Sequence, residues 1–128
     1  MRQEFKKNIV VIYHGGCSDG FGGAWATWKK FGDKAHYYGA SHGEPPLDYL
    51  RGKTIYLVDF SYPPAVVEKL IKDNVRVTAI DHHVSAERAT KLTYDYRYAV
   101  KNSGCVLAWR YFHPKKPVPR LLLHIEDI

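Results

Sequence analysis

The chain has 128 residues, of which 45% are hydrophobic and 25% charged, a balance typical of one globular domain that is long enough to bury a core. Its two cysteines cannot form a disulfide framework, no apolar run approaches the roughly 20 residues of a membrane span, and no signal-peptide pattern precedes the first apolar run. We therefore expect a cytoplasmic protein away from membranes, and the formal net charge of +6 favours an anionic partner such as a phosphate ester or nucleic acid.

The first apolar run, residues 9–13, predicts a buried strand that ends at His14. A glycine-rich stretch follows, and Ser18 and Asp19 within it are good N-cap residues. They predict a helix that begins near Asp19 and ends at Gly32. Because a helix N-terminus fed by a glycine-rich turn is an anion site, this region is a candidate for phosphate binding.

Two later strands end in the same way as the first. Residues 54–58 run directly into Asp59, and the helix that follows is expected to be capped by Ser61 or Tyr62 and closed by Asn74. The other predicted elements, apart from the strand described next, are a short strand over 35–40, a short helix over 85–91, a strand over 92–100 and a helix over 104–112 capped by Asn102 and Ser103.

The strand over 75–80 ends in Asp81, His82 and His83, and the chain is organised around this stretch. Strands that alternate with helices predict an α/β fold with a mostly parallel sheet and helices on both faces, and ligands bind at the carboxyl edge of such sheets. On extended backbone the two imidazoles should point to opposite faces, so that at most one binds a given metal directly. Asp81 is expected to orient an imidazole by a hydrogen bond.

Carboxylates and imidazoles that meet at one sheet edge can hold divalent cations, because these are the ligands that Mn²⁺, Mg²⁺ and Zn²⁺ prefer. Two metals bridged by one carboxylate can ionise a shared water and neutralise a phosphoryl group under attack, which is a phosphoesterase design. The candidate ligands are Asp19, Asp59, His82 and Asp127, with His14 and Cys17 in addition.

Each candidate also has a simpler interpretation. Taken singly, His14 could be a hydrogen-bonded histidine at a strand end, Asp59 a helix cap, and Asp127 a solvated acid near a chain end. The groups expected to be structural or on the surface are Cys105, His36, His42, His113 and His124.

Four motifs in order resemble the DHH phosphoesterase superfamily, which includes RecJ-like exonucleases, oligoribonucleases, cyclic-dinucleotide phosphodiesterases and manganese pyrophosphatases. Asp81-His82-His83 resembles the signature motif, and residues 14–23 resemble the first motif, a His followed by Asp-x-Asp and a helix start of small residues. Val58-Asp59 matches the second motif, and Asp127 stands at the place of the fourth.

The resemblance implies a two-metal site occupied by Mn²⁺, with Mg²⁺, Zn²⁺ or Fe²⁺ as alternatives. The first metal would be held by His14, Cys17 and Asp59, and the second by Asp19, Asp59, His82 and Asp127, with Asp59 bridging. The implied catalytic residues are Asp59, Asp81 and His83, with His83 at the scissile phosphate, and the implied substrate contacts are His83, Gly22 and Gly23. Cys17 departs from the family, which usually has an Asp here; a soft thiolate predicts a preference for Zn²⁺ or Fe²⁺, weak Mn²⁺ binding, or an empty first site.

The family's usual second domain, which binds the far end of the substrate, is absent from residues 1–128, so we expect a single DHH catalytic domain. The expected function is metal-dependent hydrolysis of a phosphodiester or phosphomonoester in a nucleotide or short oligonucleotide. One alternative is a catalytically weak module that holds nucleotide and metal through the glycine-rich turn, and another is a basic nucleic-acid-binding domain, which leaves the convergent acids and imidazoles unexplained. An exposed domain end is also a candidate surface for a homodimer.

Overall fold

A computed structural model of the chain describes residues 6–127. Its centre is a five-stranded sheet in the order β2-β1-β3-β4-β5, and every neighbouring pair of strands is parallel. The strands are β1 (Ile9–His14), β2 (Ala35–Ala40), β3 (Thr54–Val58), β4 (Arg76–Asp81) and β5 (Asp95–Tyr98). The predicted mostly parallel sheet is therefore confirmed, and the order places β1, β3 and β4 side by side in its middle.

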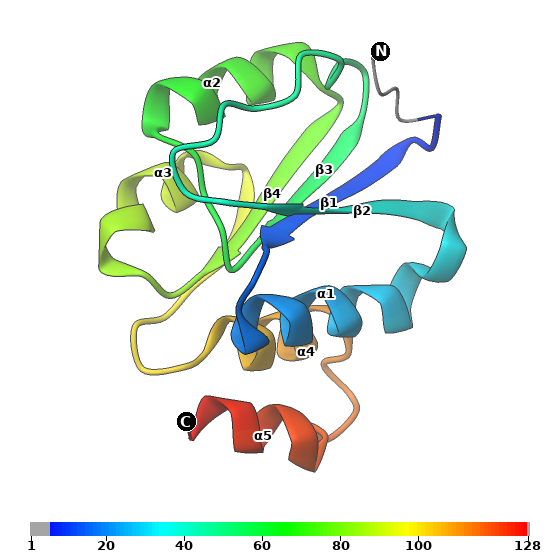
Figure 1. Cartoon of the computed structure of the whole chain (residues 1–128), viewed down its shortest axis with the longest axis vertical. Helices are drawn as coiled ribbons and strands as arrows, with labels where there is room; N and C mark the ends of the chain where they lie inside the picture. Colours follow the sequence, from blue (N-terminus) through cyan, green and yellow to red (C-terminus); the bar gives the residue numbers. More distant parts are fainter. Residues whose placement is uncertain (1–5, 128) are drawn as a thin grey trace.

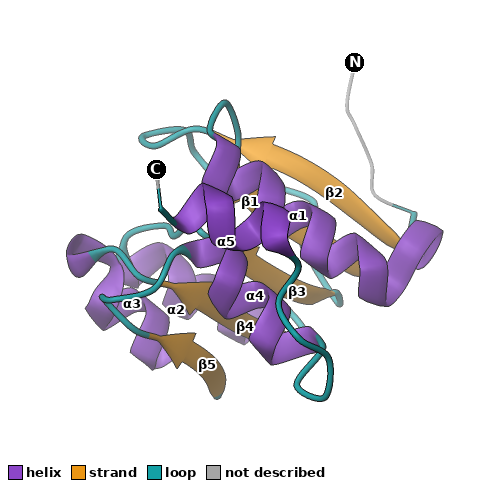
Figure 2. Cartoon of the chain, turned by 90° about the horizontal axis from the view of Figure 1, so that it is seen from below, coloured by secondary structure: helices purple, strands orange, loops and turns teal. Residues whose placement is uncertain are grey.

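Helices cover both faces of this sheet and give a three-layer, Rossmann-like α/β fold. Figure 1 shows α2 and α3 on one side of the strands and α1, α4 and α5 on the other, and Figure 2 views the sheet through the second group. The helices are α1 (Ser18–Phe31), α2 (Pro64–Asp73), α3 (Glu87–Leu92), α4 (Gly104–Phe112) and α5 (Arg120–Glu126), with short 3₁₀ turns η1 (Gly32–Lys34) and η2 (Val84–Ala86). None of the described helices is long and apolar enough to cross a membrane.

The hydrophobic core lies in two layers because side chains alternate along each strand. In β3, Ile55 and Leu57 pack in the layer that includes Val67 of α2, whereas Val58 packs in the layer that includes Val106 of α4. All five side chains are fully buried. Both faces of the central strands are thus committed to packing, and only their ends are available for polar side chains.

The ends of two helices differ from the predicted caps. The N-cap of α1 is Cys17, whose Sγ accepts a hydrogen bond from the backbone N–H of Gly20 at 3.3 Å, so Ser18 lies inside the helix. The N-cap of α2 is Pro63 rather than a Ser or Tyr side chain. Because Cys17 caps α1, the Asp19 carboxylate is not needed as the cap of its own helix and can bind to α4 instead.

Gly22 and Gly23, which were predicted to contact substrate, serve helix packing in this structure. Both are buried in α1. A Cβ at Gly23 would lie 2.6 Å from Cγ1 of Val58, and one at Gly22 would lie 2.9 Å from Cβ of Cys105. These glycines let α1 approach the sheet and α4 closely. Their role is to bring the first turn of α1 and the N-terminus of α4 together at the sheet edge.

Candidate metal centre

Asp59 is the central residue of the carboxyl edge. It follows β3, is only 1% exposed, and has a positive φ of 55°, which among the described residues no other non-glycine residue adopts. Its backbone N–H donates to the carbonyl of Ile80 at 2.9 Å, so the turn is held by the neighbouring strand. A left-handed residue other than glycine costs roughly 1–2 kcal/mol, and Asp tolerates it better than most. Strain of this kind at a buried carboxylate is typical of a functional site.

His82 lies between two carboxylates. Its Nε2 is 2.9 Å from Oδ1 of Asp59 and 3.1 Å from Oδ2 of Asp19. Hydrogen bonds to Asp19 and then Asp59 raise the pKa of His82 to about 10, against the opposing effect of burial. In this arrangement the imidazole carries a proton at neutral pH, and its single positive charge offsets part of the negative charge of the two acids.

Asp19 is fixed by a helix that lies more than eighty residues further along the chain. Its two carboxylate oxygens accept the backbone N–H groups of Gly104, at 2.9 Å, and Cys105, at 2.8 Å, at the N-terminus of α4. Burial raises the pKa of Asp19, but the hydrogen bonds from His82 and from these two N–H groups outweigh burial and hold the pKa well below its ordinary value. Asp19 is therefore an anion whose carboxylate is held in place by the N-terminus of α4.

Asp59 behaves in the opposite way. Burial raises the pKa of its carboxyl, and the hydrogen bond from His82 only partly offsets that effect. A Cβ at Gly104 would lie 2.5 Å from Oδ1 of Asp59, so α4 closes over this carboxylate with a glycine because nothing larger fits. A buried acid so placed is stabilised by any cation that comes into contact with it.

Asp81 organises the two residues that follow it. Its Oδ1 accepts the backbone N–H of His82 at 2.7 Å and that of His83 at 3.1 Å, and it lies 2.6 Å from Nδ1 of His83. Its Oδ2 is buried and has no hydrogen-bond partner among the described residues. The expectation that Asp81 orients an imidazole is confirmed in geometry, and the engaged Nδ1 leaves Nε2 of His83 for a ligand.

The two imidazoles do not point to opposite faces, so this expectation is wrong. Their ring centroids are 4.3 Å apart. The physical reason is that β4 ends at Asp81, and the Asp81 carboxylate gathers the next two backbone N–H groups into a turn, where the alternation of an extended strand no longer holds.

His14 and Cys17 approach Asp59 from its other side. Nδ1 of His14 is 4.0 Å from Oδ2 of Asp59, and Sγ of Cys17 is 3.9 Å from the same atom. Potential ligand atoms within 4.8 Å of one another form two groups that share Asp59, namely Asp59, Asp81, His82 and His83, and His14, Cys17 and Asp59. Both cysteines are free thiols.

Two of the predicted ligands, Asp19 and Asp127, are in neither group. Oδ2 of Asp19 lies 3.1 Å from Nε2 of His82, whereas Asp127 is an exposed residue that follows α5. The Glu126 carboxylate accepts the backbone N–H of Ser103 at 2.8 Å and lines, with Asp19 and His82, a cavity of about 530 Å³. Successive helical residues point about 100° apart, so an acid displaced by one position faces a different direction.

His42 is an exposed residue, as expected, and its ring lies beside the histidines of the site. Its ring centroid lies 4.7 Å from that of His14, 5.4 Å from that of Phe60 and 6.3 Å from that of His83. It comes two residues after β2 ends at Ala40, at the same edge of the sheet as the other candidates. The same reasoning about polar residues at strand ends, applied to β2, would have identified His42 as a neighbour of the site.

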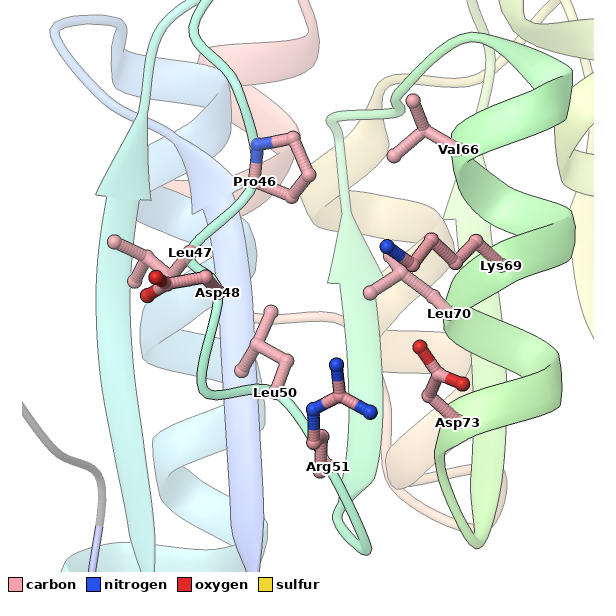
Figure 3. Close-up of a pocket in the computed structure, with 9 residues that line it drawn as sticks. All are labelled: Pro46, Leu47, Asp48, Leu50, Arg51, Val66, Lys69, Leu70 and Asp73. Atoms are coloured by element: carbon pink, nitrogen blue, oxygen red, sulfur yellow. The ribbon is translucent and has the colours of Figure 1, made fainter.

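A further pocket lies away from this cluster and contains none of the predicted site residues. Figure 3 shows it between loop 46–51 and α2, with side chains such as Leu50, Arg51, Leu70 and Asp73 around it. It encloses about 150 Å³ and carries both basic and acidic groups, so its lining does not select for an anion.

No known protein-family model matches this chain. It is similar to an uncharacterized protein of Acanthamoeba polyphaga mimivirus, with 34% identity in an alignment 135 positions long that covers 92% of this chain and 32% of the viral protein. It also resembles the crystal structure of an uncharacterized protein from Helicobacter pylori, with a TM-score of 0.68, 15% identity, and coverage of 94% of this chain and 41% of the bacterial one. The chain thus spans about a third of its viral relative, and the bacterial structure supports the α/β fold.

Proposed function

We propose that this chain is a metal-dependent phosphoesterase domain of the DHH type, which hydrolyses a phosphodiester or phosphomonoester in a nucleotide or short oligonucleotide. The observation that carries the proposal is Asp59, a strained and buried carboxylate shared by two groups of ligand atoms. A shared carboxylate between two such groups is what a two-metal hydrolytic site requires.

The residues present fit divalent cations. The buried Asp59 carboxyl has a raised pKa chiefly because of its burial, and Oδ2 of Asp81 is buried without a partner among the described residues, so the site has more acceptor oxygens than donors. Carboxylate and imidazole ligands suit Mn²⁺ or Zn²⁺, and the Cys17 thiolate favours Zn²⁺ or Fe²⁺. Bound divalent ions would lower the pKa of a water molecule and neutralise phosphoryl charge.

Four residues of the chain would have distinct roles in this reaction. Asp59 would bridge the two ions. His82 would release its proton when its Nε2 becomes a ligand, because only the neutral imidazole can bind a cation. Asp81 holds His83 through Nδ1, so the remaining ring nitrogen could stabilise negative charge that develops on the phosphate oxygens.

Loss of Asp59 should abolish the activity. We expect Mn²⁺-stimulated hydrolysis of bis(p-nitrophenyl) phosphate by the chain, and a decrease of at least about 10²–10³-fold in Asp59→Asn, which removes the bridging charge while keeping a side chain that tolerates positive φ. Asp33→Asn, at an exposed acid in η1, is the matched control. Equal rates in Asp59→Asn and wild type would contradict the proposal.

A nucleotide-binding module without turnover is the second candidate, and Cys17 is the observation that favours it. Its Sγ accepts the N–H of Gly20 and stays 3.9 Å from the nearest Asp59 oxygen, so this side of Asp59 has a soft donor already engaged in a helix cap. Nucleotide binding in equilibrium dialysis, with no hydrolysis stimulated by Mn²⁺, Zn²⁺ or Fe²⁺, would favour this candidate over the enzyme.

A further inference from the structure

An aromatic groove runs along α1 on the side of the sheet next to β2. It encloses about 200 Å³ and is almost wholly apolar. We use the name aromatic groove for the residues that line it, which are Tyr13, Phe21, Ala24, Trp25, Trp28 and Tyr37. None of these side chains belongs to the candidate metal centre, so the groove needs its own explanation.

The groove is a consequence of the two periodicities of the fold. Phe21, Trp25 and Trp28 are spaced four and three residues apart and share one face of α1. Tyr13 and Tyr37 come from the neighbouring strands β1 and β2, in alternate positions that face the same helix. Five aromatic side chains therefore line one continuous surface.

The exposed rings lie at the two ends of the α1 stretch of the groove. Phe21 is 67% exposed and Trp28 is 46% exposed. Trp25, between them, stacks on Trp109 of α4 with ring centroids 5.8 Å apart and planes within 16°, so it is fixed by the core. A contiguous exposed patch of aromatic side chains marks an interaction site more often than isolated exposed rings do.

A basic side chain accompanies the rings. Nζ of Lys29 lies 5.9 Å from the centroid of the Trp25 ring. The chain as a whole carries a formal charge of +6. Aromatic faces beside a cation match a partner that has both flat rings and negative charge, and single-stranded nucleic acid has this combination.

The groove begins close to the candidate metal centre. Tyr13 directly precedes His14, and the N–H of Phe21 donates to the carbonyl of Cys17 at 3.0 Å, one helical turn from the site. From Phe21 to Trp28 the helix rises about 10 Å, at roughly 1.5 Å per residue. With bases about 3.4 Å apart, this length accommodates about two or three stacked nucleotides.

We propose that the aromatic groove binds two or three consecutive bases of single-stranded nucleic acid, with Lys29 near a backbone phosphate. The further claim that the bound strand continues into the metal centre rests on the proposed phosphoesterase function. The base-binding itself does not, because it requires no metal.

The test is fluorescence anisotropy with a labelled, mixed-sequence 12-nucleotide single strand, measured with the whole chain in EDTA at low salt. We expect Phe21→Ala and Trp28→Ala each to weaken binding by about fivefold or more, the usual effect of removing one stacking ring. Trp28→Phe keeps a ring and should restore most of the affinity. Tyr94→Ala is the matched control, since Tyr94 is 94% exposed and lies outside the groove.

Three results would overturn the proposal. The first is affinity for the single strand that is the same in Phe21→Ala, Trp28→Ala and wild type. The second is affinity for a blunt duplex that equals that for the single strand, since the bases inside a duplex are already stacked on one another. The third is a change of oligomeric state in sedimentation by these variants with no change in binding, which would make the groove an interface between copies.

The result of the binding test can be distinguished from the result of the hydrolysis test. Binding in EDTA with no metal-dependent hydrolysis would leave the groove assignment standing and reject the enzyme. Hydrolysis of the small chromogenic diester without single-strand binding would do the reverse.

Discussion

The two sides of Asp59 are built in different ways. On one side, the buried carboxylate of Asp81 holds His82 and His83 through hydrogen-bond contacts of 2.6–3.1 Å. On the other side, His14 and Cys17 come no closer to Asp59 than 3.9–4.0 Å. The first side is held by short hydrogen bonds before any ligand arrives, whereas the second contacts Asp59 only at long distance. Preorganisation is thus concentrated on the His82–His83 side.

The largest effect is expected from removing the Asp81 charge, which organises the His82–His83 side. Asp81→Asn keeps the volume and one acceptor but weakens the hold on His83, and we expect Mn²⁺ affinity or hydrolysis to fall by about 10–100-fold, as is usual for residues that support a metal-binding histidine. Manganese affinity can be followed by electron paramagnetic resonance. Glu87→Gln, which only loosens an exposed pair with Lys91, is the control. If both variants behaved alike, the organising role of Asp81 would be refuted.

On the His14–Cys17 side, the test is to change the type of ligand at residue 17. Cys17→Asp supplies a hard carboxylate at a position that is also a helix N-cap, where Asp is well tolerated. We expect Mn²⁺ binding to strengthen by about tenfold and the preference for Zn²⁺ to decrease. Cys17→Ser keeps a capping oxygen without the charge and should not strengthen Mn²⁺ binding. An unchanged metal preference in Cys17→Asp would show that residue 17 only caps α1.

A further prediction is a pH dependence of stability from His82. Its pKa is raised to about 10 in the folded chain from an ordinary value of 6.5, so folding favours the protonated form. The stabilisation is fully present below pH 6.5 and is lost as the pH rises toward 10 and above. We expect urea unfolding in EDTA to give a free energy that decreases from pH 7 to pH 10, with a smaller decrease in His82→Gln. Equal decreases in the two proteins would argue against the bridge between Asp19 and Asp59.

Local patterns were enough for the elements and for the principal site residues. Apolar β-branched runs, each ending in an acid or a histidine, predicted β1, β3 and β4 and their common edge, and Ser103 was correctly predicted as the cap of α4. These features depend on residues that are adjacent in the chain. The same reasoning could not anticipate that Gly22 and Gly23 would be taken up by packing, because the partner surfaces come from elsewhere in the sequence.

By itself, the sequence determined the parallel α/β class and the convergence of Asp59, Asp81, His82 and His83, since strand periodicity and strand ends are local properties. Only the tertiary structure decided that Asp19 is held by the N-terminus of α4, that the exposed His42 ring lies 4.7 Å from that of His14, and that Glu126 lines a cavity with Asp19 and His82. These contacts depend on the order of the strands and on how each helix is rotated against the sheet. Both are set by the packing of the whole core, which no short stretch of residues specifies.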